Sequence, residues 1–275
     1  MKKINYKKLV IVVAWFFAIT GIALSLSFVN KQEKNITISS LNISISNPDG
    51  MSFLDETDIQ NFFNTRNERL LNNQYKNLNI PALEKSLNSH PAVANAEISA
   101  DLNGELKIMV EQRKPVLRII NQDGESYYID SKSKLMPLSE NYTARVIVAT
   151  GDLFEPFARR NDFSVEQIKG NKKYSELSML DDLWDLATYI NKDTILSALI
   201  HQINVTSKKE IELFPSIGNH KILFGPATNI AEKFNKLKIF YKEGLNKTNS
   251  WNNYTQINLK YKNIIVGTRN SSNTK

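Results

Sequence analysis

The sequence NIPALEKSLNSHPAVANAEISADLNGELKIMVEQRKPV, residues 79–116, predicts a helix followed by a β-hairpin. Asn79 is a suitable N-cap for the helix. Residues 93–100 then predict a strand, and Asn103-Gly104 is the dipeptide most typical of a tight hairpin turn. The second strand of the hairpin is predicted from apolar residues at every second position: Leu106, Ile108 and Val110.

The residues before this stretch extend it into a small domain. Apolar and polar residues alternate between Ile36 and Ile45 with one phase slip near Ser40, which predicts a half-buried strand with a β-bulge. Asp55 can cap a short helix with apolar residues on one face. The predicted order over residues 36–113 is therefore strand, helix, helix, strand, strand. That order can place two helices on one face of a three-stranded sheet.

The following part of the chain, residues 114–268, is predicted to be a β-rich domain with two helices. The helices are expected at residues 174–191 and 229–243, with Gly244 as the C-cap of the second. Residues 152–172 are expected to form a loop, and residues 269–275 a frayed tail. Strands are predicted at 116–120, 126–130, 144–149, 199–206, 210–214, 220–224 and 255–261, the last continuing weakly to Val266. The predicted fold class is therefore α+β.

An uncharged run at the start of the chain predicts a single transmembrane helix, Leu9 to Val29. About 21 helical residues span ~32 Å, enough for a hydrocarbon core of ~30 Å. Four lysines lie in residues 1–8, so this tail is expected in the cytoplasm and the bulk of the chain across the membrane. A cleaved signal peptide is the alternative, but its apolar core would be shorter, and Trp15 lies near the middle of this run.

The composition excludes some classes of site. The chain has no cysteine, so it has neither disulfides nor thiolate metal ligands. The formal net charge is +7, but the lysines are scattered, so no nucleic-acid-binding surface is predicted.

A catalytic site is not predicted either. The three histidines have no recognisable carboxylate partner, and the sequence lacks the usual nucleophile, zinc-protease and nucleotide-binding motifs. The acidic group Asp181, Asp182 and Asp185 is more simply explained as a solvated helix face than as a metal site. We therefore expect no enzyme activity, cofactor, metal or small-molecule ligand.

The aromatic residues around the last predicted strand raise a different possibility. Trp251, Tyr254 and Tyr261 could pack against the preceding helix, or they could form an interface with another protein, where aromatic residues are enriched. If the strand at 255–261 is also a sheet edge, its unpaired N–H and C=O groups could accept a strand from another chain.

Four motifs in this order resemble the FtsQ/DivIB family of bacterial cell division proteins. LNSHPAVANA (87–96) is similar to the end of the family's small domain, and LKIMVEQRKPV (106–116) to the run that joins its two domains. YIDS (128–131) resembles the start of the family's β domain, and QINLKY (256–261) its closing strand. The last motif differs at two positions: Asn258 stands where the family usually has aspartate, and Lys260 where it has arginine.

The resemblance implies a non-enzymatic scaffold with a POTRA-like domain and a β domain. It would lie in the bacterial inner membrane at the division septum, as a single-pass protein with most of the chain in the periplasm. Its β domain would bind FtsB- and FtsL-like bitopic proteins by strand addition and so coordinate septal cell-wall synthesis. Candidate partner-binding residues implied in this way are Trp251, Tyr254, Ile257, Leu259, Lys260 and Tyr261.

Two other functions remain open at this point. POTRA modules also serve as docking domains in outer-membrane assembly and secretion, although such proteins usually carry several modules or a barrel. A membrane-anchored envelope enzyme would need a cluster of polar groups that the sequence does not reveal.

Overall fold

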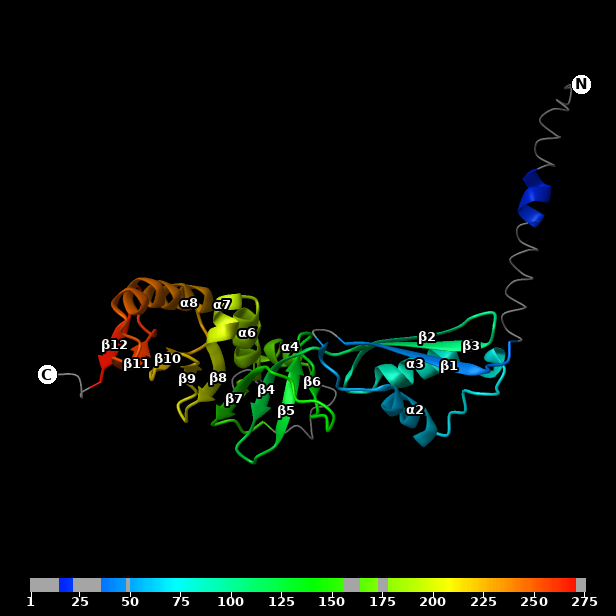
Figure 1. Cartoon of the computed structure of the whole chain (residues 1–275), viewed down its shortest axis with the longest axis horizontal. Helices are drawn as coiled ribbons and strands as arrows, with labels where there is room; N and C mark the ends of the chain where they lie inside the picture. The colour runs from blue at the N-terminus through cyan, green and yellow to red at the C-terminus, as the bar shows by residue number, and fades with distance from the viewer. Residues whose placement is uncertain (1–14, 22–35, 48–49, 156–163, 173–177, 271–275) are drawn as a thin grey trace, which may run out of the picture. The chain divides into compact units, whose positions relative to one another are not determined.

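The structure is a computed structural model that describes residues 15–21, 36–47, 50–155, 164–172 and 178–270 (Figure 1). The chain divides into two compact units, Met1–Asn47 with Leu54–Gln112 and Pro48–Phe53 with Arg113–Lys275.

The predicted membrane span, residues 9–29, lies mostly outside the described residues. Residues 15–21 are helical. No helix in the described part of the chain is long and apolar enough to cross a membrane. The single transmembrane helix therefore stays a prediction.

The first unit has the element order that the sequence predicts. Two helices lie on the same face of a sheet that has three strands in the described residues, in the order β1-β3-β2 (Figure 1). Strand β1 runs parallel to β3, whereas β2 and β3 form an antiparallel hairpin. The elements are β1 (Ser40–Ser46), α2 (Glu56–Thr65), the 3-10 turn η2 (Tyr75–Asn77), α3 (Ile80–Asn88), β2 (Val93–Ala100) and β3 (Glu105–Gln112).

Local signals explain where these helices begin. Asp55 accepts the backbone N–H of Asp58 and Asp58 accepts that of Asp55, which is a reciprocal capping box. The Asn79 side chain accepts from the N–H of Ala82 at 3.2 Å. Apolar residues from both helices and the sheet then form the core of the unit: Ile43, Ile59, Phe63, Leu83, Leu87, Ile98, Leu106, Ile108 and Val110.

The second unit is built on a sheet of nine strands in the described residues, in the order β12-β11-β10-β9-β8-β7-β4-β5-β6. Helices α6, α7 and α8 lie along one face of this sheet (Figure 1). The strands are β4 (Pro115–Ile120), β5 (Ser126–Asp130), β6 (Leu135–Met136), β7 (Ile147–Gly151), β8 (Ile200–Val205), β9 (Ile211–Pro215), β10 (Lys221–Gly225), β11 (Tyr254–Asn258) and β12 (Val266–Arg269).

Helices connect two of the parallel strand pairs of this sheet, whereas the elements between the third parallel pair, β4 and β7, are the strands β5 and β6. Strands β7 and β8 are parallel neighbours, as are β10 and β11, and parallel strands need a long crossover. The first crossover contains α4 (Val165–Lys169), α6 (Leu180–Asn191) and α7 (Thr194–Leu199); the second contains α8 (Ile230–Ile239) and a π-helical continuation η4 (Phe240–Asn246). The α+β fold class is therefore confirmed.

The structure corrects several of the sequence-based expectations for this unit. The expected loop at residues 152–172 contains α4, and α7 is a further helix that was not predicted. Gly244 is not a C-cap, because the helix continues past it as η4. The last predicted strand, 255–261, is followed by a separate strand, β12, that pairs back onto it.

The start of the second unit is held by a buried ion pair between two of the recognised motifs. The guanidinium of Arg113 lies 2.9 Å from the Asp130 carboxylate, and both side chains are largely buried. The other Asp130 oxygen accepts the N–H groups of Lys132 and Lys134. The indole N–H of Trp184 donates to the Asp130 carbonyl at 2.9 Å. Removing either partner would leave the other charge buried and uncompensated, so this ion pair joins the two motifs in the fold.

Candidate partner-binding site

Strand β11, which contains the predicted partner-binding residues, is an interior strand. It pairs with β10 on one side and with β12 on the other. The N–H of Leu259 donates to the carbonyl of Leu223 at 3.0 Å, so the residues after β11 also remain attached to β10. The expectation that this strand forms a sheet edge is therefore wrong. The physical reason is that residues 259–265 turn the chain back, and β12 then covers the edge of β11.

Two of the predicted contact residues belong to the core. Ile257 and Leu259 are both 0% exposed and pack in the main apolar cluster of the second unit. A partner cannot reach such side chains without opening the core. Their role is to hold β11 in the sheet.

Trp251 and Tyr254 are half-buried, and they pack against the helix before them. The Trp251 ring stacks on His220 and lies 4.9 Å from the Tyr241 ring, centroid to centroid. Tyr254 makes an edge-to-face contact with Phe240 at 5.9 Å. Of the two explanations for these aromatics, packing against the preceding helix is therefore the arrangement observed in the isolated chain.

The centre of this aromatic cluster is an unusual polar pair. His220 is 3% exposed, and its Nε2 lies 2.7 Å from the Tyr241 hydroxyl. Burial lowers the pKa of His220, with a smaller opposing effect from the carbonyl of Trp251. Burial also raises the pKa of Tyr241 well above its ordinary value. Both side chains are therefore neutral at physiological pH, as their apolar surroundings require.

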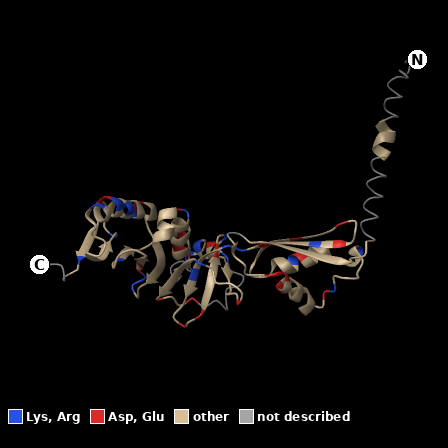
Figure 2. Cartoon of the chain, viewed as in Figure 1, with Lys and Arg blue, Asp and Glu red and all other residues tan. Residues whose placement is uncertain are grey.

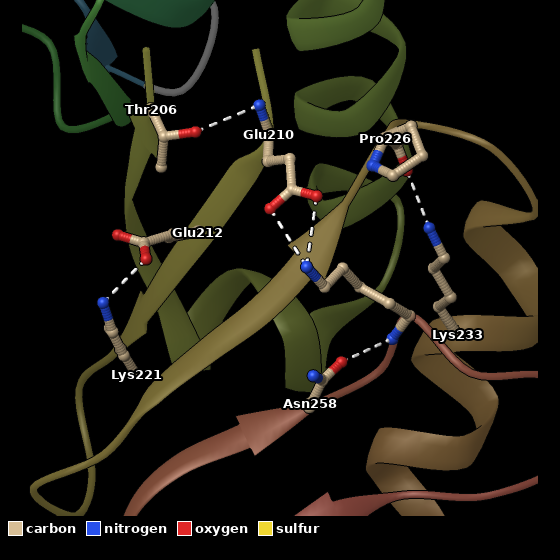
Figure 3. Close-up of polar contacts among 8 residues, drawn as sticks. Thr206, Glu210, Glu212, Lys221, Pro226, Lys233 and Asn258 are labelled. Atoms are coloured by element: carbon tan, nitrogen blue, oxygen red, sulfur yellow. Dashed lines mark hydrogen bonds and ion pairs between the residues drawn. The ribbon is translucent and has the colours of Figure 1, made fainter. Parts of the chain in front are cut away.

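Lys260 is exposed, but its ammonium has a partner within the chain, the carboxylate of Glu210, which is labelled in Figure 3. Its ammonium lies 3.1 and 3.0 Å from the two carboxylate oxygens of Glu210. The aliphatic part of Lys260 crosses over Gly225, where an added Cβ would lie 2.8 Å from the lysine Cγ and Cδ. Gly225 also has φ +73°, so both its conformation and its lack of a side chain admit Lys260.

The same contacts explain why the two departures from the family motif are tolerated. The Asn258 side-chain oxygen accepts the backbone N–H of Lys260 at 3.0 Å, a bond that an aspartate oxygen would make equally well. The lysine at 260 makes the carboxylate pair that an arginine could make.

Tyr261 is the most exposed of the six candidates. Its side chain is 52% exposed, and its carbonyl accepts from the Lys236 ammonium at 2.7 Å. Among the predicted residues, Lys260 and Tyr261 thus lie at the surface, whereas the other four are buried or half-buried.

The edge of the sheet on this side is β12, whose four residues are all exposed. Its inner side faces β11: Asn270 N–H donates to Asn253, and the Thr268 carbonyl accepts from the Thr255 hydroxyl. Because peptide groups alternate in direction along a strand, those of Gly267 and Arg269 point away from the sheet. No further strand pairs with β12 in the described part of the chain. These two residues therefore present backbone donors and acceptors to the outside.

The opposite edge of the sheet is shorter and partly covered. Strand β6 has two residues, and both are buried. A β-bridge joins Lys134 to Ser164, and the N–H of Val165 donates to the Ser133 carbonyl. Short and covered edges are the usual protection against unwanted strand pairing. Strand β12 has four residues, and no segment in the described part of the chain covers its outer edge.

Sequence reasoning missed β12 as the edge. Its available signal is Gly267, which pairs with Ile257 and lies against the nearby Tyr254 ring: an added Cβ at Gly267 would lie 2.6 Å from Cε1 of that ring. An aromatic ring that covers a glycine on a neighbouring edge strand is a known device for fixing strand register. Asn263, with φ +64°, supplies the turn between the two strands.

Basic residues recur along α8 close to this region (Figure 2). Lys233 donates to the Pro226 carbonyl at 2.7 Å, and burial lowers its pKa (Figure 3). Lys236 pairs with Glu232, and Lys238 with Asp193, whose hydrogen bond raises the pKa of Lys238. These lysines are committed to contacts within the chain and do not form a free cationic stripe.

The acidic group on α6 is also tied into the fold. Asp185 lies 2.6 Å from Lys169, and burial, followed by the charges of Asp181 and Asp185, raises the pKa of Asp182. These three aspartates are half-buried and less solvated than the sequence suggested. Among the described residues, no group of His, Asp and Glu is arranged to hold a metal ion.

Comparison with known families gives two matches. Residues 37–111 match a POTRA-like domain, and residues 114–268 match the family described as FtsQ/DivIB, C-terminal related. No curated protein matches the chain in a sequence comparison. Both matching families are non-catalytic scaffold families.

The FtsQ/DivIB match covers more than half of the chain, and the POTRA-like match precedes it in the order that the sequence motifs predict. The chain therefore belongs to the FtsQ/DivIB C-terminal-related family of division proteins, with a POTRA-like domain before its C-terminal domain.

Proposed function

We propose that this protein is a non-enzymatic scaffold of the bacterial division machinery that binds other division proteins by strand addition to β12. The observation that carries the proposal is the open edge formed by Val266–Arg269, in contrast to the short, covered edge at β6. Family membership supports the division-related role.

Strand addition would use the backbone for affinity. The outward-facing peptide groups of Gly267 and Arg269 would bond to a partner strand, and such ladders add affinity without requiring a particular side chain. Side chains on alternate positions of β12 would then select the partner, because successive residues point to opposite faces. The partners we propose are FtsB- and FtsL-like proteins with a single membrane span.

The six candidate residues from the sequence analysis have two different roles in this proposal. Tyr261, exposed in the turn before β12, would contact the partner beside the edge. The other candidates, Trp251, Tyr254, Ile257, Leu259 and Lys260, would position β11 and so hold β12 in place.

The proposed setting is the inner membrane at the division septum, with residues 1–8 cytoplasmic and both units in the periplasm. The charge distribution around the uncharged run 9–29 supports this topology. Because the chain has no cysteine, this topology can be tested by introducing single cysteines and labelling them from one side of the membrane.

The test compares Arg269→Pro with Arg269→Ala in the full-length protein. Proline removes the outward N–H and is tolerated on edge strands, whereas alanine removes the side chain but keeps the N–H. Co-purification of FtsB- and FtsL-like proteins should fall at least ~10-fold for Arg269→Pro, roughly the value of one lost hydrogen bond, and stay near the original level for Arg269→Ala.

Two outcomes would overturn this proposal. One is that Arg269→Pro retains its division partners at the original level. The other is that the complexes isolated with the protein contain outer-membrane assembly or secretion components in place of division proteins, which would favour the POTRA docking alternative.

A further inference from the structure

The turn between β11 and β12, residues 259–265, has few hydrogen bonds of its own. Its first residue stays in the sheet, because the N–H of Leu259 donates to the carbonyl of Leu223 at 3.0 Å. Residues 260–265 are all described, and none of them makes a backbone–backbone hydrogen bond in the structure. Side chains therefore set the path of the chain from β11 back to β12.

The returning half of this turn, residues 261–265, receives a single hydrogen bond in the described part of the chain. The Lys236 ammonium, on α8, donates to the Tyr261 carbonyl at 2.7 Å. The Lys236 side chain is 17% exposed, so most of its aliphatic part lies against the protein. A charged donor makes a stronger hydrogen bond than a neutral one. This contact ties α8 to the turn.

The two ends of the turn are fixed by other contacts. At its beginning, the Asn258 side-chain oxygen accepts the N–H of Lys260, and the Lys260 ammonium pairs with Glu210. At its end, Ile265 packs against the main apolar cluster of the second unit. The bond from Lys236 lies between these two anchors and is the polar contact that fixes the middle of the turn.

Strand β12 depends on this turn for its position. It has four exposed residues, and in the described part of the chain it pairs with β11 alone. Its side chains bury little apolar surface, so packing contributes little to its stability. In a hairpin the turn sets the register of the two strands, and a turn that moves would let the outer strand slip or detach.

We propose that Lys236 is a positioning residue for partner binding: its hydrogen bond to the Tyr261 carbonyl holds β12 in the sheet as a preformed edge. This inference rests on the proposed strand addition to β12. A preformed edge binds a partner strand more tightly, because the free protein has already lost the conformational freedom that binding would otherwise remove. Lys236 acts through the turn.

The test measures amide hydrogen exchange of the full-length protein, without any partner, in Lys236→Met and Lys236→Arg. Methionine keeps an unbranched side chain but removes the donor, whereas arginine keeps a charged donor. The Thr268 amide, which faces β11, should exchange at least ~10-fold faster in Lys236→Met. In Lys236→Arg its exchange should stay within about 2-fold of the original rate.

Two controls separate positioning from a general loss of stability. The Leu259 amide, which is bonded to Leu223 in the same sheet, should keep its original slow exchange in Lys236→Met. Glu232 lies 3.7 Å from Lys236 on the same helix, so Glu232→Gln removes that ion pair but keeps the bond to the turn. This variant should leave Thr268 exchange unchanged.

Partner binding is then measured in the same variants. Co-purification of FtsB- and FtsL-like proteins should fall at least ~5-fold for Lys236→Met, because the edge must first be ordered before it can pair. Lys236→Arg should restore the original level, which a role of the aliphatic part alone would not predict.

Three results would overturn this inference. They are unchanged Thr268 exchange in Lys236→Met, an equal increase in exchange at Thr268 and Leu259, and full partner capture by Lys236→Met under conditions in which Arg269→Pro loses its partners. The proposed function fails separately, if Arg269→Pro keeps its division partners. Thr268 exchange is measured without a partner, so in that case it still decides whether Lys236 holds β12.

Discussion

Strands β11 and β12 lie next to each other in the same sheet, yet they have opposite relations to solvent. In β11 and the residues after it, Ile257 and Leu259 are fully buried. In β12 all four residues are exposed, and Val266 is 44% exposed. The interior strand of the sheet, β11, is thus the one with buried apolar residues, and the exposed strand beside it, β12, is the edge.

This difference separates two properties that are easily confused. Apolar and aromatic residues stabilise a strand by packing, whereas unpaired peptide groups allow it to accept another strand. Strand β11 has the first property and β12 has the second. The following predictions test this division of roles, beginning with the largest expected effect.

Alanine at a buried and at an exposed apolar position should have very different costs. Leu259→Ala should lower the free energy of unfolding by about 2–5 kcal/mol, because it empties a fully buried site. Val266→Ala, on the edge, should cost less than about 0.5 kcal/mol. Urea denaturation of the two variants measures both values. Equal costs would contradict the burial of the Leu259 side chain in the core.

The contact between the two strands can be tested at Gly267. Gly267→Ala should cost about 1–3 kcal/mol, because its Cβ would overlap the Tyr254 ring, which must move. The same change in a Tyr254→Ala background should cost much less, since the ring is gone. A double-mutant cycle by thermal denaturation gives the coupling. Purely additive effects would show that the ring does not cover Gly267.

The aromatic cluster before β11 predicts a pH dependence of stability. Burial lowers the pKa of His220 below its ordinary value of 6.5, so below pH 6.5 the unfolded chain binds a proton that the folded protein does not. The contribution of neutral, buried His220 to stability is therefore complete above pH 6.5. It is lost as the pH falls from 6.5 toward the pKa that His220 has in the folded protein.

Thermal denaturation between pH 7.5 and 5 checks this dependence. The melting temperature should fall with pH in the unmodified protein and fall less in His220→Gln, where the titrating group is absent. A steeper fall in His220→Gln would assign the effect to other groups.

The smallest effect is expected at Lys260. Its ion pair with Glu210 is partly exposed, so Lys260→Ala should cost at most about 1 kcal/mol and less in high salt. Lys260→Arg should keep both the stability and the partner, since the guanidinium can make the same pair. Loss of partner binding in Lys260→Ala with unchanged stability would instead make Lys260 a direct contact.

Much of the first unit could be predicted because its signals are local. The Asp55 and Asn79 caps, the Asn103-Gly104 turn and the alternation through β3 each lie within a few residues of the feature they determine. The phase slip near Ser40 likewise corresponds to two N–H groups that share the Gly104 carbonyl.

The second unit was harder because its decisive contacts are distant in sequence. Whether β11 is an edge depends on β12 returning to pair with it, and the weak pattern after Tyr261 predicts a continuation of the same strand, not a second strand that turns back. Helix α4 has five residues, too few to show a clear period. The roles of Lys260 and Trp251 depend on Glu210 and His220, which lie 50 and 31 positions away.

The central claim is that β12 accepts a partner strand, and residue-resolved amide hydrogen exchange of the full-length protein tests it most directly. Exchange would be compared with and without a co-purified FtsB- and FtsL-like complex. The account predicts that the Gly267 and Arg269 amides become protected only in the complex, while the Thr268 amide is protected in both states. Unchanged exchange at Gly267 and Arg269 in a saturated complex would contradict it.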